Sequence, residues 1–267
     1  DTALAATPGL ARHSATRRHV HQQPAGVTLI TDDGASHCAA GLIAADGGGG
    51  AGRHHVASNG SAGVLQRKVA MRAQVPLDSL PAHFALASSN LWLGRGVHVV
   101  HYPIGAMLNL VVTMPASRVV DGWQQRVIPA TSPLAVLANA DITWVRTPLA
   151  MAEAASCWRR GRVVLAGDAA HSMPPHLAQG AGQGLQDAAS LAHHLASADD
   201  IEAAFAGYVR ERAGDVSRIV QKADVSGKIM GLSGPAAHLR DLALSMGGPR
   251  LMQSWLAEVW AADPKLA

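Results

Sequence analysis

The run from Gly161 to Ala192, GRVVLAGDAAHSMPPHLAQGAGQGLQDAASLA, constrains the fold more than any other part of the chain. Its unbroken apolar stretch, Val163–Ala166, is typical of a strand that is buried on both faces. Asp168 follows at the carboxyl end of this strand, where α/β sheets bind their ligands. A loop with two prolines then leads into a helix that begins on Gly180-Ala181-Gly182. This order predicts a pocket for an extended, polyhydroxylated, anionic cofactor.

The residues of this run suit such a ligand chemically. The Asp168 carboxylate can accept hydrogen bonds from sugar or ribityl hydroxyls, and Gly167 has no side chain to keep the ligand away. The helix that begins at Gly180 offers unpaired N–H groups and the positive end of its dipole, which would stabilise developing negative charge, for example on the N1–C2 carbonyl edge of a reduced flavin. The simpler alternative makes Gly-Asp a tight turn with Asp168 as a helix N-cap. The strand, the prolines and Gln179-Gly180 in series favour the pocket.

Composition excludes several function classes. The 267 residues are 48% apolar, which is enough for one large core or two small ones. The net charge is only +3, with 22 Lys and Arg scattered among 19 Asp and Glu, so we expect no nucleic-acid partner. No apolar run approaches the roughly eighteen residues of a membrane span. Cys38 and Cys157 make no disulfide framework, so a soluble, cytoplasmic protein is expected.

The start of the chain and the spacing of its histidines lead to two further expectations. The chain begins at Asp1 without a signal-peptide pattern, so we expect a processed chain or a piece of a longer one. Asp168, His171 and His176 fit no common zinc spacing, so no metal site is expected.

The first third of the chain predicts strands and a glycine-rich loop. Residues 27–30 and 37–46 read as two strands joined by a hairpin turn at Thr31–Gly34. Glycines 47–50 follow, and they suit either a flexible linker or a loop that lets the backbone approach a ligand.

The remainder predicts an antiparallel sheet followed by helices. Residues 64–114 are strand-like, with a turn at Ile104–Ala106. Helices are expected over 201–228 and 235–260. Two sets of residues are expected to pack inside: the tryptophans Trp123, Trp144 and Trp158, and one face of the helix after Gly180, formed by Ala181, Leu185, Ala188, Ala192 and Leu195.

The central run closely resembles the second flavin-binding motif of the single-component aromatic hydroxylases, which use FAD and a nicotinamide reductant. The matching residues are Gly167-Asp168-Ala169-Ala170-His171, Pro175, Ala178-Gln179-Gly180 and Gln186-Asp187-Ala188, preceded by Trp158 and Gly161-Arg162. Leu42–Gly47 with Arg53 resembles the family's Asp-Gly motif, and Gly94–Pro103 with Asn109–Val111 resembles its substrate-domain strand pair. Within the family, the chain is most similar to the salicylate and 6-hydroxynicotinate monooxygenases.

The resemblance implies a fold and a division of the chain. We expect an α/β (α+β) protein in which an incomplete, Rossmann-like FAD-binding domain is interleaved with an antiparallel-sheet substrate domain. Residues 1–60 and 146–200 would bind FAD, residues 61–145 would bind the substrate, and residues 201–267 would form C-terminal helices. The family's G-x-G-x-x-G turn, which receives the ADP pyrophosphate, has no counterpart in these residues, so we expect the family's first portion to be missing.

The resemblance also implies the site. His98 and Tyr102 share one face of a strand, so His98 can take a ring-hydroxyl proton while Tyr102 holds a carboxylate or the oxyanion. Alternatively, His98 is an ordinary strand histidine. His176 is either a substrate contact or a solvent-facing loop residue. The residues implied to bind FAD are Val20, Asp46, Gly47, Gly167, Asp168, Pro175, Gln179, Gly180 and Ala181.

The implied function is an FAD-dependent monooxygenase. It would use NADH or NADPH and O₂ to hydroxylate an aromatic hydroxy acid through a C4a-hydroperoxyflavin. Its partners would be the small aromatic substrate and O₂, with no nucleic acid and no membrane, and a homodimer is left open. The alternative is a truncated, non-catalytic protein of the same family that binds an aromatic ligand or a protein partner.

Overall fold

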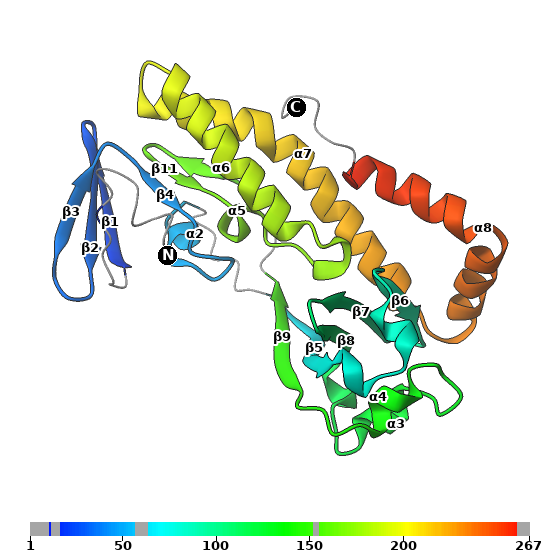
Figure 1. Ribbon diagram of the computed structural model, residues 1–267. Helices are drawn as coiled ribbons and strands as arrows, with labels where there is room; N and C mark the ends of the chain where they lie inside the picture. The colour runs from blue at the N-terminus through cyan, green and yellow to red at the C-terminus, as the bar shows by residue number, and fades with distance from the viewer. Residues whose placement is uncertain (1–10, 12–16, 57–63, 152–154, 261–267) are drawn as a thin grey trace. The chain divides into compact units, whose positions relative to one another are not determined.

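A computed structural model describes residues 11, 17–56, 64–151 and 155–260 (Figure 1). The chain forms two compact units with discontinuous boundaries. Unit 1 takes in residues 1–62, 154–172 and 180–216, and unit 2 takes in residues 63–153, 173–179 and 217–267. The mixture of helices with antiparallel sheets confirms the expected α/β (α+β) class. The functional division into residues 1–60, 61–145, 146–200 and 201–267 stays a prediction.

The first sheet of unit 1 is a three-stranded antiparallel meander. Its strands are β1 (Arg17–Gln23), β2 (Gly26–Thr31) and β3 (Ser36–Ala39). The predicted turn is confirmed, because the Gly34 N–H donates to the Thr31 carbonyl at 3.1 Å and Gly34 has a φ of +84°. The sequence analysis missed β1, since its polar, His-rich residues pair with β2 through backbone hydrogen bonds that need no apolar side chains.

The prediction of one strand over residues 37–46 is wrong. The segment divides into β3 and β4 (Leu42–Ala44), and these two strands belong to different sheets. Gly41 lies at the break, where an added Cβ would come within 2.8 Å of the Ile201 side chain and 3.0 Å of the Phe205 ring. Only glycine therefore lets the chain pass so close to the helix that carries these two residues.

The second sheet of unit 1 has the order β10-β11-β4, where β10 is Arg159–Arg160 and β11 is Val163–Leu165. All three residues of β11 are fully buried, which confirms the predicted buried strand. β11 pairs with β4 in parallel, with Leu165 opposite Ala44. The carboxyl ends of β4 and β11 therefore lie at the same edge of the sheet.

The glycine run after β4 forms a tight turn, so the linker interpretation is wrong. The Gly50 N–H donates to the Gly47 carbonyl at 3.0 Å, and the Gly52 N–H donates to the Asp46 carboxylate at 2.7 Å. A Cβ on Gly50 would overlap that carboxylate. The turn leads directly into α2 (Ala51–Val56). These glycines therefore let the backbone fold closely around Asp46.

Besides α2, the helices of unit 1 are α5 (Asp168–His171), α6 (Gly180–Ser197) and the first part of α7 (Ile201–Met230). The start of α6 is as predicted, but its predicted apolar face is wrong. Leu185 on that face is 74% exposed. The residues that α6 buries are Gln183, Asp187, Ser190 and Leu191. A polar network, described below, is buried on α6 in place of the apolar face that helical periodicity predicted.

Unit 2 contains a five-stranded antiparallel sheet with the order β6-β7-β8-β5-β9. The strands are β5 (Val64–Pro76), β6 (Asn90–Leu93), β7 (His98–Ile104), β8 (Met107–Pro115) and β9 (Val145–Met151). The predicted turn between β7 and β8 is confirmed, with Gly105 at a φ of +57°. The helices are η1 (Leu77–Ser79), η2 (Ala82–Ala85), η3 (Ala116–Arg118), α3 (Trp123–Val127), α4 (Ala135–Asn139), η4 (Pro175–Leu177), the second part of α7, and α8 (Gly234–Trp260).

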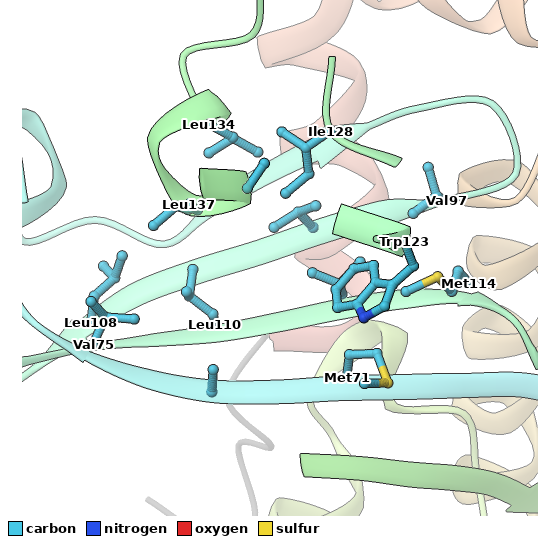
Figure 2. Packing of buried hydrophobic residues seen from close by; sticks show 14 of the residues in the cluster. Met71, Val75, Val97, Leu108, Leu110, Met114, Trp123, Ile128, Leu134 and Leu137 are labelled. Carbon is cyan, nitrogen blue, oxygen red and sulfur yellow. The ribbon is translucent and has the colours of Figure 1, made fainter. Parts of the chain in front are cut away.

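One face of this sheet carries the core of unit 2 (Figure 2). Figure 2 shows Met71 and Met114 close to the ring of Trp123. The rings of Trp123 and Trp144 meet edge to face at 5.0 Å between centroids. Trp158, in unit 1, is 6% exposed, so the predicted tryptophan anchors are confirmed. Since side chains alternate along a strand, the opposite face of the sheet is left for other residues.

His101 is an unusual member of the core face. It is 2% exposed, and neither of its ring nitrogens has a hydrogen-bond partner in the part of the chain that the structure describes. Its ring lies 5.2 Å from Phe84 and 6.2 Å from Trp92 between centroids. Burial, aided by His83, lowers the pKa of His101 below its usual value. His101 therefore packs as a neutral aromatic ring.

Candidate active site

His98 and His176 lie together in unit 2. His98 is the first residue of β7 and is 6% exposed, and His176 lies in η4. Their ring centroids are 5.2 Å apart with the rings edge to face. This pairing favours the interpretation of His176 as part of a binding site over that of a solvent-facing loop residue.

The local sequence explains how His176 reaches this place. Pro174 and Pro175 fix the backbone on its N-terminal side, and Ala178 turns the chain with a φ of +54°. Across from the ring lies Gly227 of α7, where a Cβ would overlap the imidazole. The absence of a side chain at Gly227 therefore makes room for His176.

Tyr102 is on the same face of β7 as His98, as predicted, and is half-buried. The two residues are four positions apart, which corresponds to about 13 Å between their Cα atoms at the usual rise of an antiparallel strand. Tyr102 makes no ring contact with either histidine within the described residues.

The two histidines are neutral at pH 7. Burial lowers the pKa of His98 to about 3, with smaller contributions from His176 and Lys68. Burial also lowers the pKa of His176 to about 4, aided by Lys68 and opposed by Asp224. Each neutral ring offers one N–H donor and one acceptor nitrogen, and the buried Nδ1 of His176 has no partner among the described residues. The pair can therefore form hydrogen bonds with a hydroxyl or an oxyanion.

A cavity of about 930 Å³ opens beside His98. Its apolar wall includes Trp92, Val97 and Ile128, and its polar wall includes Arg95, Arg118 and Arg126. The volume is in the range of small-molecule sites, and the arginines favour an anionic ligand.

The predicted flavin-binding residues of unit 1 gather at one edge of its parallel strand pair. Gly167 and Asp168 follow β11, and Asp46 and Gly47 follow β4, so both acidic motifs lie beyond the carboxyl ends of parallel neighbours. An Arg53 guanidinium N–H donates to the Ala169 carbonyl at 3.2 Å and ties the two motifs together. This is the edge at which open α/β sheets bind ligands.

Asp168 does not act as the N-cap of α5. Gly167 occupies the N-cap position, with a φ of +59° that favours glycine, and Asp168 is the first helical residue. The Asp168 side chain is exposed and has no hydrogen-bond partner among the described residues, so the carboxylate is free to bind a ligand. Asp46, in contrast, already accepts the Gly52 N–H at 2.7 Å.

The other predicted cofactor residues are dispersed. Val20 is half-buried on β1, and Gly180 and Ala181 form the first turn of α6. Pro175 and Gln179 belong to unit 2, immediately before that helix in the chain. The roles of all of them in FAD binding stay predictions.

Beneath the Gly167 turn lies a buried polar network that the sequence analysis missed. The fully buried Asp187 carboxylate accepts the Gly167 N–H at 2.9 Å, the His171 Nε2–H at 2.5 Å and the Arg212 Nε–H at 3.0 Å. Arg212 also donates to Gln183 Oε1 at 2.7 Å. Burial opposes ionisation of Asp187, but these donors together lower its pKa below the usual value. The network holds α6 and α7 against the turn that carries Asp168.

Known structures share this fold. The Klebsiella pneumoniae HpxO complex with FAD and uric acid superposes with a TM-score of 0.80 at 24% identity, covering 92% of this chain and 66% of that one. A substrate complex of salicylate hydroxylase superposes with a TM-score of 0.75 at 24% identity, covering 96% of this chain and 70% of the other. These similarities show that the chain shares the fold of an FAD-binding protein and of a salicylate hydroxylase.

The sequence comparisons identify the family. The model described as "FAD binding domain" matches residues 6–223. The 3-amino-4-hydroxybenzoate 2-monooxygenase PtmB3 of Streptomyces platensis is 34% identical over 89% of this chain, and the 3-hydroxybenzoate 6-hydroxylase of Polaromonas naphthalenivorans is 31% identical over 83%. The chain belongs to the FAD-binding family of aromatic-ring monooxygenases, whose cofactor is FAD. It spans 63% and 58%, respectively, of the length of these two relatives.

Two further observations bear on other site types. No helix among the described residues is long and apolar enough to cross a membrane. Within the same residues, no group of three or more His, Cys, Asp or Glu side chains is arranged to hold a metal ion.

The buried network gives a stability prediction. Replacing Asp187→Asn should lower the free energy of unfolding by about 3 kcal/mol, because Arg212 is left buried without an ionised partner. Replacing the exposed Asp168→Asn should change it by less than about 0.5 kcal/mol. Denaturant unfolding of the two variants measures the difference. A D187N protein within about 1 kcal/mol of the wild type would contradict the role of the network.

The neutral histidine pair gives a pH prediction. Because the pKa values of His98 and His176 fall to about 3 and about 4 in the folded chain, the unfolded chain takes up protons first as the pH drops below 6.5. The two histidines should make their full contribution to the free energy of unfolding above pH 6.5. Below pH 6.5 this contribution should fall by at most about 1.4 kcal/mol per pH unit for each histidine. Denaturant unfolding between pH 7.5 and pH 5 should show a shallower fall in the double variant H98Q/H176Q. The exposed His193→Gln serves as the control, and equal slopes in all three proteins would refute the prediction.

Proposed function

We propose that this chain is the larger part of an FAD-dependent monooxygenase that hydroxylates an aromatic hydroxy acid with NADH or NADPH and O₂. The observation that carries the proposal is the buried, neutral His98–His176 pair, with Tyr102 on the same face of the sheet. Membership of the family supports the reaction type. The names of two relatives, which act on hydroxybenzoates, support the substrate class.

The residues present in unit 1 fit the ribityl and ring portions of FAD. The free Asp168 carboxylate can accept hydrogen bonds from ribityl hydroxyls, and Gly167 leaves no Cβ in their path. The first N–H groups of α6, from Gly180 onward, can hold the electron-rich edge of the reduced ring. When bound, the flavin would take electrons from the nicotinamide and activate O₂.

The residues of unit 2 would prepare the substrate. The acceptor nitrogen of His98 takes the proton of the ring hydroxyl, and the resulting phenolate pushes electron density onto the carbon to be hydroxylated. Although burial lowers the pKa of His98, an anionic substrate would raise it, because a negative charge nearby favours the imidazolium. His176, whose ring lies beside that of His98, would hold the oxyanion, and Tyr102 would help to orient the ring. The neutral state of the pair therefore suits proton transfer from a bound phenol.

The proposal is tested by activity with and without the proposed base. The 267-residue chain and its full-length gene product are titrated with FAD, and NADH or NADPH oxidation is followed with 3-hydroxybenzoate and salicylate. We expect a yellow full-length protein whose oxidation of the nicotinamide is stimulated by the aromatic acid. The variant H98Q should retain FAD and lose about 10²-fold or more of the hydroxylation rate, because it lacks the base. His193→Gln should leave the rate unchanged.

Two outcomes would overturn the proposal. A full-length protein that stays colourless with excess FAD would exclude a flavoenzyme. Thermal stabilisation by an aromatic acid in such a colourless protein would favour the non-catalytic binding protein instead.

A further inference from the structure

A lysine shares the sheet face on which the histidine pair lies. The register pairs His98 with Thr113 across β7 and β8, and Thr113 with Ala70 across β8 and β5. Residues opposite one another in register point to the same side, so His98 and Ala70 share a face, and Lys68, two residues before Ala70, is on that face as well. Lys68 pairs with Pro115, beyond the His98 end of β7, whereas Tyr102 lies towards the other end of that strand.

Helix α7 gives Lys68 and His176 their places. A Cβ on Gly231 would lie 3.3 Å from the Lys68 Nζ, so the ammonium lies directly against the backbone of this helix. One turn earlier, Gly227 makes room for the His176 ring in the same way. Since residues four apart share a helix face, one face of α7 borders both side chains.

The positive charge of Lys68 has no partner within the described residues. No carboxylate there lies within ion-pair distance of its Nζ. Asp224, which acts on His176, is paired with Lys228 at 2.6 Å. The charge of Lys68 nevertheless reaches the site, because it contributes to lowering the pKa of both His98 and His176. The histidine pair thus borders a half-buried cation that lacks a counter-ion.

We propose that Lys68 binds the carboxylate of the aromatic substrate and thereby selects acids over neutral phenols. This inference rests on the proposed function. The two neutral histidines can form hydrogen bonds with a ligand but cannot neutralise a carboxylate, so an anionic ligand needs a separate cation. With the ring hydroxyl at His98, the carboxylate points away from Tyr102 and toward Lys68. The role of carboxylate ligand therefore passes from Tyr102 to Lys68.

The test compares an acid with its neutral amide. Dissociation constants for 3-hydroxybenzoate and 3-hydroxybenzamide are measured by calorimetry on the full-length FAD-loaded protein and its variants. The wild type should bind the acid at least about tenfold more tightly than the amide, and Lys68→Met should abolish this preference while leaving amide binding within about twofold. Lys68→Arg should retain most of the preference. The ratio of the two dissociation constants distinguishes recognition of the carboxylate charge from a folding defect, because a folding defect would weaken the binding of both ligands.

The matched control is Arg72→Met, which is exposed and lies on the same strand and the same face, four residue pairs along the sheet from Lys68. It should keep the preference of the wild type for the acid. A K68M protein that keeps the preference, or an R72M protein that loses it, would overturn the assignment of Lys68 while leaving the proposed function intact. Failure of the wild type to bind either ligand would instead remove the proposed function, and the assignment of Lys68 with it.

Discussion

The flavin-binding half of the candidate site depends on the buried carboxylate of Asp187. It holds the Gly167 N–H at the end of β11 and also binds His171 and Arg212. A charged group at full burial is costly unless each of its oxygens is hydrogen-bonded, and here both are. Gly167 adopts a φ of +59°, which glycine does without strain, and the hydrogen bond from its N–H to Asp187 holds the turn that carries Asp168. The Asp168 carboxylate thus stays available to a ligand because the Asp187 carboxylate holds the turn that carries it.

The candidate substrate site depends on the alternation of the sheet in unit 2. Along β5 and β8, one set of alternate residues fills the core around Trp123, and the other set faces away from it. The second set includes Lys68, with His98 on the neighbouring β7. Because a shift of register by one residue would exchange the two faces, the packing of the core also fixes where the site residues point.

The sequence predicted those features that local chemistry determines. Residue types that favour one local conformation predicted four features correctly: the buried strand β11, the turns at Gly34 and Gly105, and the start of α6. The buried face of α6 could not be predicted in this way, because the partner that makes Asp187 a buried residue is Arg212, 25 positions away along the chain. The break at Gly41 likewise depends on side chains of α7. His98 and Tyr102 were predicted from the resemblance, and their place on one strand face follows from local two-residue periodicity. Lys68 was missed because only the strand register brings it to the same face.

The low pKa values of the histidine pair and the unpaired charge of Lys68 are two consequences of one arrangement. Burial and a neighbouring cation both favour neutral imidazoles, so the site holds a lysine cation beside two weak bases. A carboxylate bound at Lys68 would remove the repulsion that this cation exerts on an imidazolium, and a phenolate at His98 would stabilise the imidazolium directly. The same ligand that satisfies the cation would therefore make His98 a stronger base. In this arrangement an aromatic acid is favoured twice, once in binding and once in losing its ring proton, whereas a neutral phenol would have neither advantage.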